Sequence, residues 1–137
     1  MIQKVLKNME GKWKYQQTIY NLQKHQTNYY QNTFLVEMEN NNKIHFIYDK
    51  EQKKNYIEIL QANSFNKITT YNNNLNAKQY LYKQQRINLF KIKYRDNNVI
   101  YDETLNLINS NFFLSTIKIK YKNKYIAIAF NSYIKLS

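Results

Sequence analysis

The stretch that decides the fold is RINLFKIKYRDNNVIYDETLNLINSNFFLSTIKIKY, residues 86–121. Apolar and polar side chains alternate along it, and Asn-rich breaks at 96–98 and 109–110 divide it into three runs. β-Branched and aromatic side chains dominate these runs, and such residues fit a half-buried pleated sheet. The stretch therefore predicts three consecutive strands, at residues 86–95, 99–108 and 111–121.

The same pattern continues in both directions from this stretch. Further runs separated by short polar breaks lie at residues 12–22, 31–39, 43–49, 55–61, 65–71, 77–82 and 125–136. About ten strands with short links predict an all-β, antiparallel, up-and-down barrel, because closure removes both exposed sheet edges. A barrel of about this size has room inside for one small ligand.

The N-terminal segment has a different period. Its apolar residues lie on one helical face, which predicts a short helix over residues 2–10 that ends at Gly11. The length of 137 residues is that of one ordinary domain, so we predict a single domain over residues 1–137. Since no long apolar run is present, we expect neither a secretory signal nor a membrane span.

The composition excludes several kinds of site. The absence of Cys excludes disulfide scaffolds, Cys-ligated metal centres and a cysteine nucleophile in this chain. A single glycine excludes a Gly-rich phosphate loop. His25 and His45 are too isolated for a metal site, and neither Ser115 nor Ser132 belongs to a recognisable catalytic triad. We therefore predict no metal.

The chain is strongly basic, with a formal net charge of +12. Asn, Lys, Ile and Tyr are abundant while Gly and Pro are scarce, which is typical of A/T-rich coding. The positive electrostatic field that this net charge produces favours encounters with acidic partners. A basic β-barrel that binds nucleic acid through Lys and Tyr is an alternative. Because Lys is spread over nearly every strand and turn, as codon bias predicts, we expect no nucleic-acid partner.

Two segments carry a family resemblance. GKWKYQQTIYNL (11–22) is similar to the pattern G-x-W-x-S-Q-R-T-x-Y-x-L. ETLNLINSNFFLSTIKIK (103–120) followed by IAIAFNSYIKLS (126–137) is similar to E-x-x-W-F-x-x-P-N-L-R-L-R-T-S and A-S-F-C-S-E-I-R. These patterns belong to the S-type phycobiliprotein chromophore lyases, the CpcS/CpeS family, and the chain resembles that family from end to end.

The resemblance implies a ten-stranded, lipocalin-like barrel and a bilin lyase activity. Such lyases bind a phycobilin, an open-chain tetrapyrrole, and attach it through a thioether to a cysteine of a phycobiliprotein α or β subunit. The bilin is the substrate, and no cofactor of the lyase itself is implied. The resemblance leaves open whether the chain acts alone, as a homodimer or with a related lyase. A bilin carrier without transfer activity is an alternative.

The matched positions also imply site residues. Glu103 matches the functional glutamate of the family, and the alternative is an exposed strand acid beside Asp102. Trp13 and Tyr20 are candidates for the aromatic wall of the bilin site, while a Trp that plugs the closed end of the barrel is the alternative for Trp13. Asn111 retains the asparagine of the motif.

The sequence departs from the motifs at charged positions. Gln17, Phe113 and Ser115 replace arginines, and Tyr133 replaces an acid. Arg86 and Lys135 are candidates to meet the bilin propionates instead. From the coding bias we expect an organelle-encoded protein of the plastid stroma, with a bacterial cytoplasm as the alternative.

Overall fold

The computed structural model describes residues 8–40, 43–48, 54–62, 65–71 and 77–136. Its strands are β1 (Gly11–Asn21), β2 (Gln26–Asn40), β3 (Lys43–Tyr48), β4 (Lys54–Ala62), β5 (Phe65–Tyr71), β6 (Ala77–Arg86), β7 (Leu89–Asp96), β8 (Val99–Asn109), β9 (Phe112–Tyr121) and β10 (Lys124–Lys135). All of these strands pair antiparallel, so the predicted all-β antiparallel fold is confirmed.

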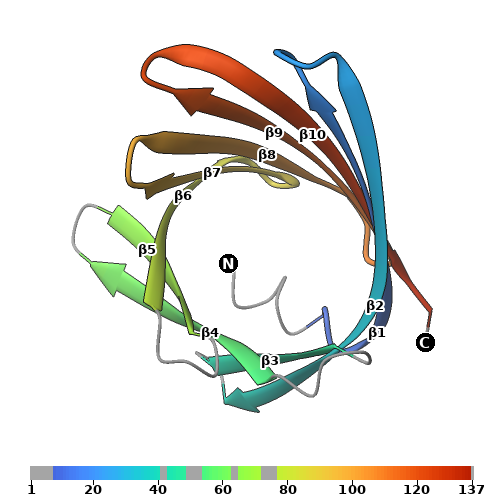
Figure 1. The fold of residues 1–137 in the computed structure, drawn as a ribbon. Helices are drawn as coiled ribbons and strands as arrows, with labels where there is room; N and C mark the ends of the chain where they lie inside the picture. The colour runs from blue at the N-terminus through green and yellow to red at the C-terminus, as the bar shows by residue number, and fades with distance from the viewer. Residues whose placement is uncertain (1–7, 41–42, 49–53, 63–64, 72–76, 137) are drawn as a thin grey trace.

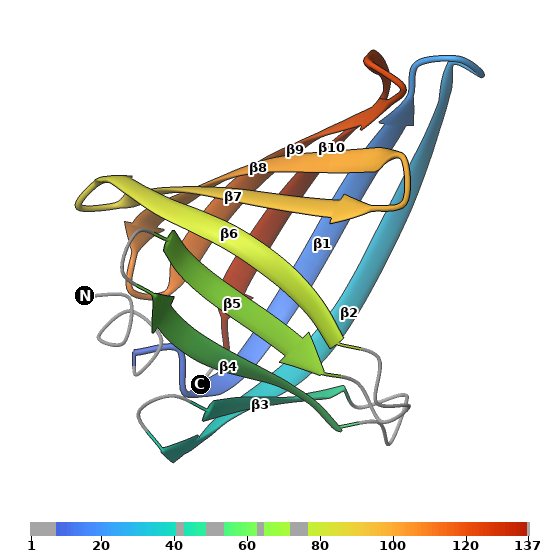
Figure 2. The same cartoon turned by 90° about the vertical axis from the view of Figure 1, so that its left-hand side faces the viewer.

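Each strand pairs with its neighbour in the sequence, and β1 also pairs with β10. The resulting strand order is β1-β10-β9-β8-β7-β6-β5-β4-β3-β2, and Figure 1 looks into the space that the curved sheet surrounds. The β1–β2 and β9–β10 hairpins extend together at one end (Figure 2), where the Leu22 amide donates to the Ile126 carbonyl at 2.9 Å. We call this the hairpin end.

Three segment boundaries differ from the prediction. β2 begins at Gln26 rather than at residue 31, because backbone pairing with β1 continues to Asn21↔Gln26 despite the low β-propensity of Asn and Gln. Arg86 ends β6 instead of beginning the next strand. Of the predicted helix over residues 2–10, residues 2–7 lie outside the described ranges, and residues 8–9 form a turn. Within the described ranges, no helix has the length and apolar character to cross a bilayer.

The turns explain how a chain with one glycine makes tight hairpins. His25, Asn97, Lys122 and Asn123 all adopt positive φ, between 46° and 64°. At the β1–β2 turn the Asn21 side chain accepts hydrogen bonds from the amides of Gln23 and Lys24, both at 3.0 Å. Asparagine takes the left-handed position at Asn97 and Asn123, as its short polar side chain allows, whereas His25 and Lys122 take it at the other two positions.

The pairing register identifies the inner face of the sheet. Trp13 pairs with Phe34, Phe113 with both Tyr133 and Leu107, and Leu105 with Phe90. The buried hydrophobic side chains occupy these alternating positions and belong to one cluster: Trp13, Phe34, Val36, Tyr82, Phe90, Leu107 and Phe113. Alternation alone does not distinguish the two faces, whereas burial does. The cluster fills the interior at the end opposite the hairpin end and forms its floor.

Candidate functional site

Four inward polar side chains form a hydrogen-bonded row just above the apolar floor. The Tyr15 hydroxyl donates to Asn131 Oδ1 at 3.1 Å, and Asn131 Nδ2 donates to Ser115 Oγ at 2.9 Å. The Ser115 hydroxyl in turn hydrogen-bonds the Glu103 carboxyl group. The four residues come from β1, β10, β9 and β8, so the row crosses four neighbouring strands. We call these residues the polar row.

Glu103 lies at the end of the polar row in apolar surroundings. Its partners in the pairing register are Ile92 on β7 and Ile117 on β9. Burial raises the pKa of the Glu103 carboxyl group, and the hydrogen bond from Ser115 lowers it by less. Asp102 points to the opposite face, where its side chain is 45% exposed. The structure therefore distinguishes the two adjacent acids and makes Glu103 the inner one.

The raised pKa gives a testable pH dependence of stability. Because the folded state holds the Glu103 proton more tightly, the unfolded chain releases it first as the pH rises, and stability falls through that window. Glutamine does not titrate, so Glu103→Gln should remove this loss and gain stability relative to the parent between about pH 4 and about pH 7. Urea unfolding at both pH values measures the free energy of unfolding of the variant and of the parent. If the variant gains no stability relative to the parent at the higher pH, the Glu103 carboxylate is not destabilised by burial.

Trp13 lies in the floor of the interior. It is fully buried, its Nε1 donates to the Met9 carbonyl at 2.7 Å, and its ring lies 4.9 Å from that of Phe113. The structure thus places Trp13 in the packed floor of the interior. The rings of Tyr15 and Tyr133, 5.1 Å apart, lie in the next layer and extend the aromatic surface toward the polar row.

The structure brings together several of the predicted site residues. Ser115 and Phe113 are both 4% exposed and point inward. Tyr133 packs edge-on against Phe34 at 6.5 Å. Gln17 is half-buried opposite Asn131. Neutral or aromatic side chains therefore occupy the inner positions at which the family motifs have charged residues.

Four other predicted residues lie away from Glu103. Tyr20 is on the outer face of β1, where its hydroxyl hydrogen-bonds His25 Nδ1 at 3.1 Å. Arg86 and Asn111 are exposed near turns at the floor end. Lys135 is also at that end, where its Nζ donates to the Asn8 carbonyl at 3.1 Å and lies 6.0 Å from the Trp13 ring.

Two members of the polar row, Tyr15 and Asn131, were not among the predicted site residues. A signal for both was present in the sequence. A period of two from Trp13 places Tyr15 on the same face, and Asn131 alternates with Ala127 and Ala129, both of which are buried. The alternation groups these residues, but their hydrogen bonds depend on the pairing of four strands.

The interior places the Glu103 carboxyl group, which can bind or release a proton, next to small and apolar side chains of β9 and β10. Toward the hairpin end the inner face of β10 carries the small side chains Ala127 and Ala129, and β9 carries Ile117 and Ile119. A carboxyl group with a raised pKa is able to accept hydrogen bonds from N–H donors when ionised and to donate a proton when neutral. The chemistry of these residues suits a molecule that has both apolar surface and N–H groups.

Comparisons with known proteins agree with this picture. No family model matches the chain. A protein of Gracilaria tenuistipitata var. liui, named chromophore lyase CpcS/CpeS homolog, is 28% identical over 154 aligned positions, covering 96% of this chain and 95% of that protein. Among solved structures, the S-type phycobiliprotein lyase CPES from Guillardia theta has a TM-score of 0.70 at 8% identity, covering 99% of this chain and 93% of the other.

A second structure has the same fold without a known activity. It is a protein of unknown function of the DUF3598 family from Nostoc punctiforme, with a TM-score of 0.66 at 10% identity, and the match covers 96% of this chain and 48% of that one. At such low identities the structures establish the fold alone. The match along nearly the whole of both sequences and the motifs at both ends support the likeness of this chain to the S-type chromophore lyases, CpcS/CpeS.

Proposed function

We propose that the protein binds a phycobilin inside a closed, lipocalin-like cup and attaches it to a cysteine of a phycobiliprotein subunit. The observation that carries the proposal is Glu103, a buried inner carboxyl group joined to the polar row, in a chain whose curated relative is named a chromophore lyase. The pairing of β1 with β10 supports the cup. The absence of Cys suits a reaction whose nucleophile belongs to the acceptor.

The proposed reaction is the addition of a thiol to a double bond. The acceptor sulfur forms a C–S bond to the ethylidene carbon of the bilin, the C=C π bond breaks, and the tetrapyrrole takes up one proton in exchange for the thiol proton. The step needs no oxidant or reductant. Glu103 holds the pyrrole N–H groups as a carboxylate and supplies the proton as a carboxylic acid.

The absence of charge at these inner positions affects where the bilin propionates can lie. Phe113, Ser115 and Tyr133 offer no charge to the two propionates, so we propose that these carboxylates point toward solvent at the hairpin end. The apolar and aromatic walls then bury the tetrapyrrole body. We propose that the protein works in the plastid stroma, as its coding bias suggests.

Titration with a phycobilin tests the binding step. Addition of phycocyanobilin or phycoerythrobilin, each in turn, to the purified protein should red-shift and sharpen the pigment absorbance, because the cup holds an extended, protonated chromophore. A free-pigment spectrum at micromolar protein would contradict the proposal. Pigment uptake without transfer to an apo-phycobiliprotein subunit would favour the carrier alternative.

A further inference from the structure

A hollow of about 670 Å³ is lined mostly by outward-facing positions of the sheet, with Tyr82, Ile92 and Glu103 also in its lining. It spans β6 to β9 and extends to Tyr125 on β10. Its lining side chains include Lys83, Lys91, Lys93 and Lys118. We call this hollow the outer groove. Its lysines alternate along the strands with Tyr82, Ile92 and Glu103, so their side chains lie on the opposite face of the sheet from the Glu103 side chain.

The pairing register arranges the side chains of the outer groove in two parallel rows. One row runs from Lys83 through Lys91 and Thr104 to Thr116, and the Lys91 ammonium donates to Thr104 Oγ1 at 2.7 Å. It places two ammonium groups beside two hydroxyls. Like charges directly opposite each other on neighbouring strands destabilise a sheet, so an anionic partner between Lys83 and Lys91 would relieve their repulsion.

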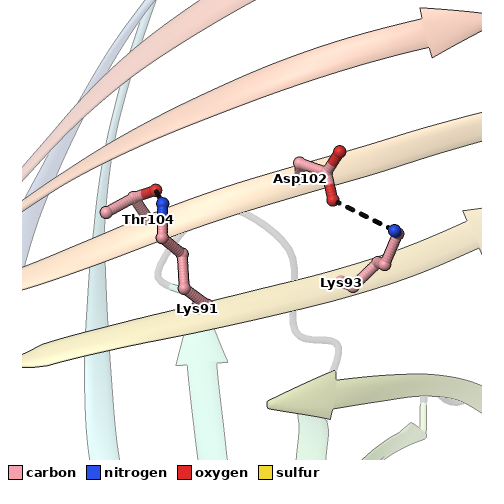
Figure 3. A network of polar contacts seen from close by, with 4 residues as sticks. All are labelled: Lys91, Lys93, Asp102 and Thr104. Carbon is pink, nitrogen blue, oxygen red and sulfur yellow. Dashed lines mark hydrogen bonds and ion pairs between the residues drawn. The ribbon is translucent and has the colours of Figure 1, made fainter. Parts of the chain in front are cut away.

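The second row has an acid between two bases. Asp102 pairs in register with Lys93 on β7 and with Lys118 on β9, and Lys93 Nζ lies 3.8 Å from Asp102 Oδ1 (Figure 3). The Lys93 side chain is 61% exposed, so this ion pair contributes little to stability and leaves the ammonium accessible. Among the side chains described on this face of the groove, the lysines outnumber the acid by four to one.

Two observations favour a protein over a nucleic acid in the outer groove. Lys120 Nζ lies over the Tyr125 ring at 4.7 Å and Lys122 Nζ over the Tyr121 ring at 5.3 Å, so a lysine covers one face of each ring that a base would otherwise stack on. Asp102 would repel phosphates at the centre of the groove. A protein surface carries donors as well as carboxylates, and it can therefore satisfy Asp102 and the lysines together.

We infer that the outer groove is a docking site for a carboxylate-rich protein surface. On the basis of the proposed function, that surface belongs to the phycobiliprotein subunit that receives the bilin. The lysines of the first row meet its carboxylates, and the exposed Tyr121 and Tyr125 at the hairpin end add apolar contact area of the kind enriched at protein interfaces. The acceptor is thus held on the outside of the cup, next to the hairpin end toward which we propose that the propionates point.

Charge reversal in the outer groove tests the inference. The double variant Lys83→Glu/Lys118→Glu should weaken binding to an apo-phycobiliprotein subunit about tenfold at low salt and flatten the salt dependence of the association rate. Lys12→Glu/Lys24→Glu, which changes exposed lysines elsewhere on the molecule, lowers the net charge equally and should change the affinity less than about twofold. Biolayer interferometry with the full chain measures both variants.

The outcomes separate docking from pigment binding. Phycobilin uptake should be unchanged in both double variants, because the substituted side chains of the groove lie on the opposite face of the sheet from the Glu103 side chain. Equal weakening by the two variants would show that net charge alone attracts the subunit and would overturn the inference. Tighter binding of oligothymidylate than of the subunit would overturn it in favour of a nucleic acid. If the parent protein takes up pigment but does not bind the subunit, the docking site fails while the bilin proposal stands.

Discussion

Replacing Trp13 with alanine is expected to lower the free energy of unfolding by about 3–5 kcal/mol. The side chain is fully buried, and its ring packs 4.9 Å from Phe113 in the cluster that closes the floor of the barrel. Truncation leaves a cavity among large side chains and also leaves the Met9 carbonyl without its indole donor. Trp13 pairs with Lys135 at the floor end of the β1–β10 pairing, so this loss falls where the first and last strands meet.

Urea unfolding followed by circular dichroism measures the effect. Trp13→Phe keeps an aromatic ring and loses the N–H, so it should cost clearly less than the alanine variant. Tyr30→Ala removes a side chain that is 55% exposed and should change the unfolding free energy by no more than about 0.5 kcal/mol. A Trp13→Ala loss below about 1 kcal/mol would show that the floor is not close-packed around this ring.

The strands were predictable because their signal is local. A period of two and Asn-rich breaks indicate strand segments in a chain with almost no Gly or Pro, and side chains such as Asn21 and Asn97 explain why. The start of β2 was missed because residues 26–30 have a polar composition, and it is their hydrogen bonding to β1 that makes them a strand. Arg86 was assigned to the wrong strand because Ile87 and Leu89 continue its alternation across the turn.

Site residues that belong to a family motif were predictable from the sequence. Contacts that arise only when distant strands pair were not. Glu103 follows from the family pattern, but its burial depends on which face of β8 points inward, and alternation does not decide this. The hydrogen bonds from Tyr15 to Asn131 and from Asn131 to Ser115 link residues up to 116 positions apart. Tyr20 lies on the outer face of β1 beside His25, and its spacing in the motif carries no information about the face it occupies.

The two faces of β8 have different chemistry. Glu103 faces the interior, where burial raises the pKa of its carboxyl group, whereas Asp102 and Thr104 face the outer groove and its lysines. One strand thus serves the proposed pigment site on one side and the proposed docking site on the other. Substitutions at neighbouring positions of β8 should therefore separate pigment chemistry from acceptor binding.

Replacing Glu103 with glutamine is expected to lower the rate of bilin transfer by about 100- to 10,000-fold, the range of a lost general acid or base. Phycobilin affinity should fall by less than about tenfold, because the amide keeps the size of the side chain and one oxygen acceptor for pyrrole N–H groups. The raised pKa of Glu103 also predicts that the parent rate falls as the pH rises through that pKa, since the acid form supplies the proton. Covalent pigment on an apo-phycobiliprotein subunit, followed by its fluorescence in denaturing gels, measures transfer.

Glu37→Gln is the matched control for this variant. Glu37 is an exposed acid on β2, so its amide variant has the same chemical change without the buried site, and its transfer rate should stay within about twofold of the parent rate. Equal losses of binding and transfer in Glu103→Gln would make Glu103 a binding residue rather than the proton donor. An unchanged rate in Glu103→Gln would remove the carboxyl group from the reaction, because the polar row contains no other carboxyl group to replace it.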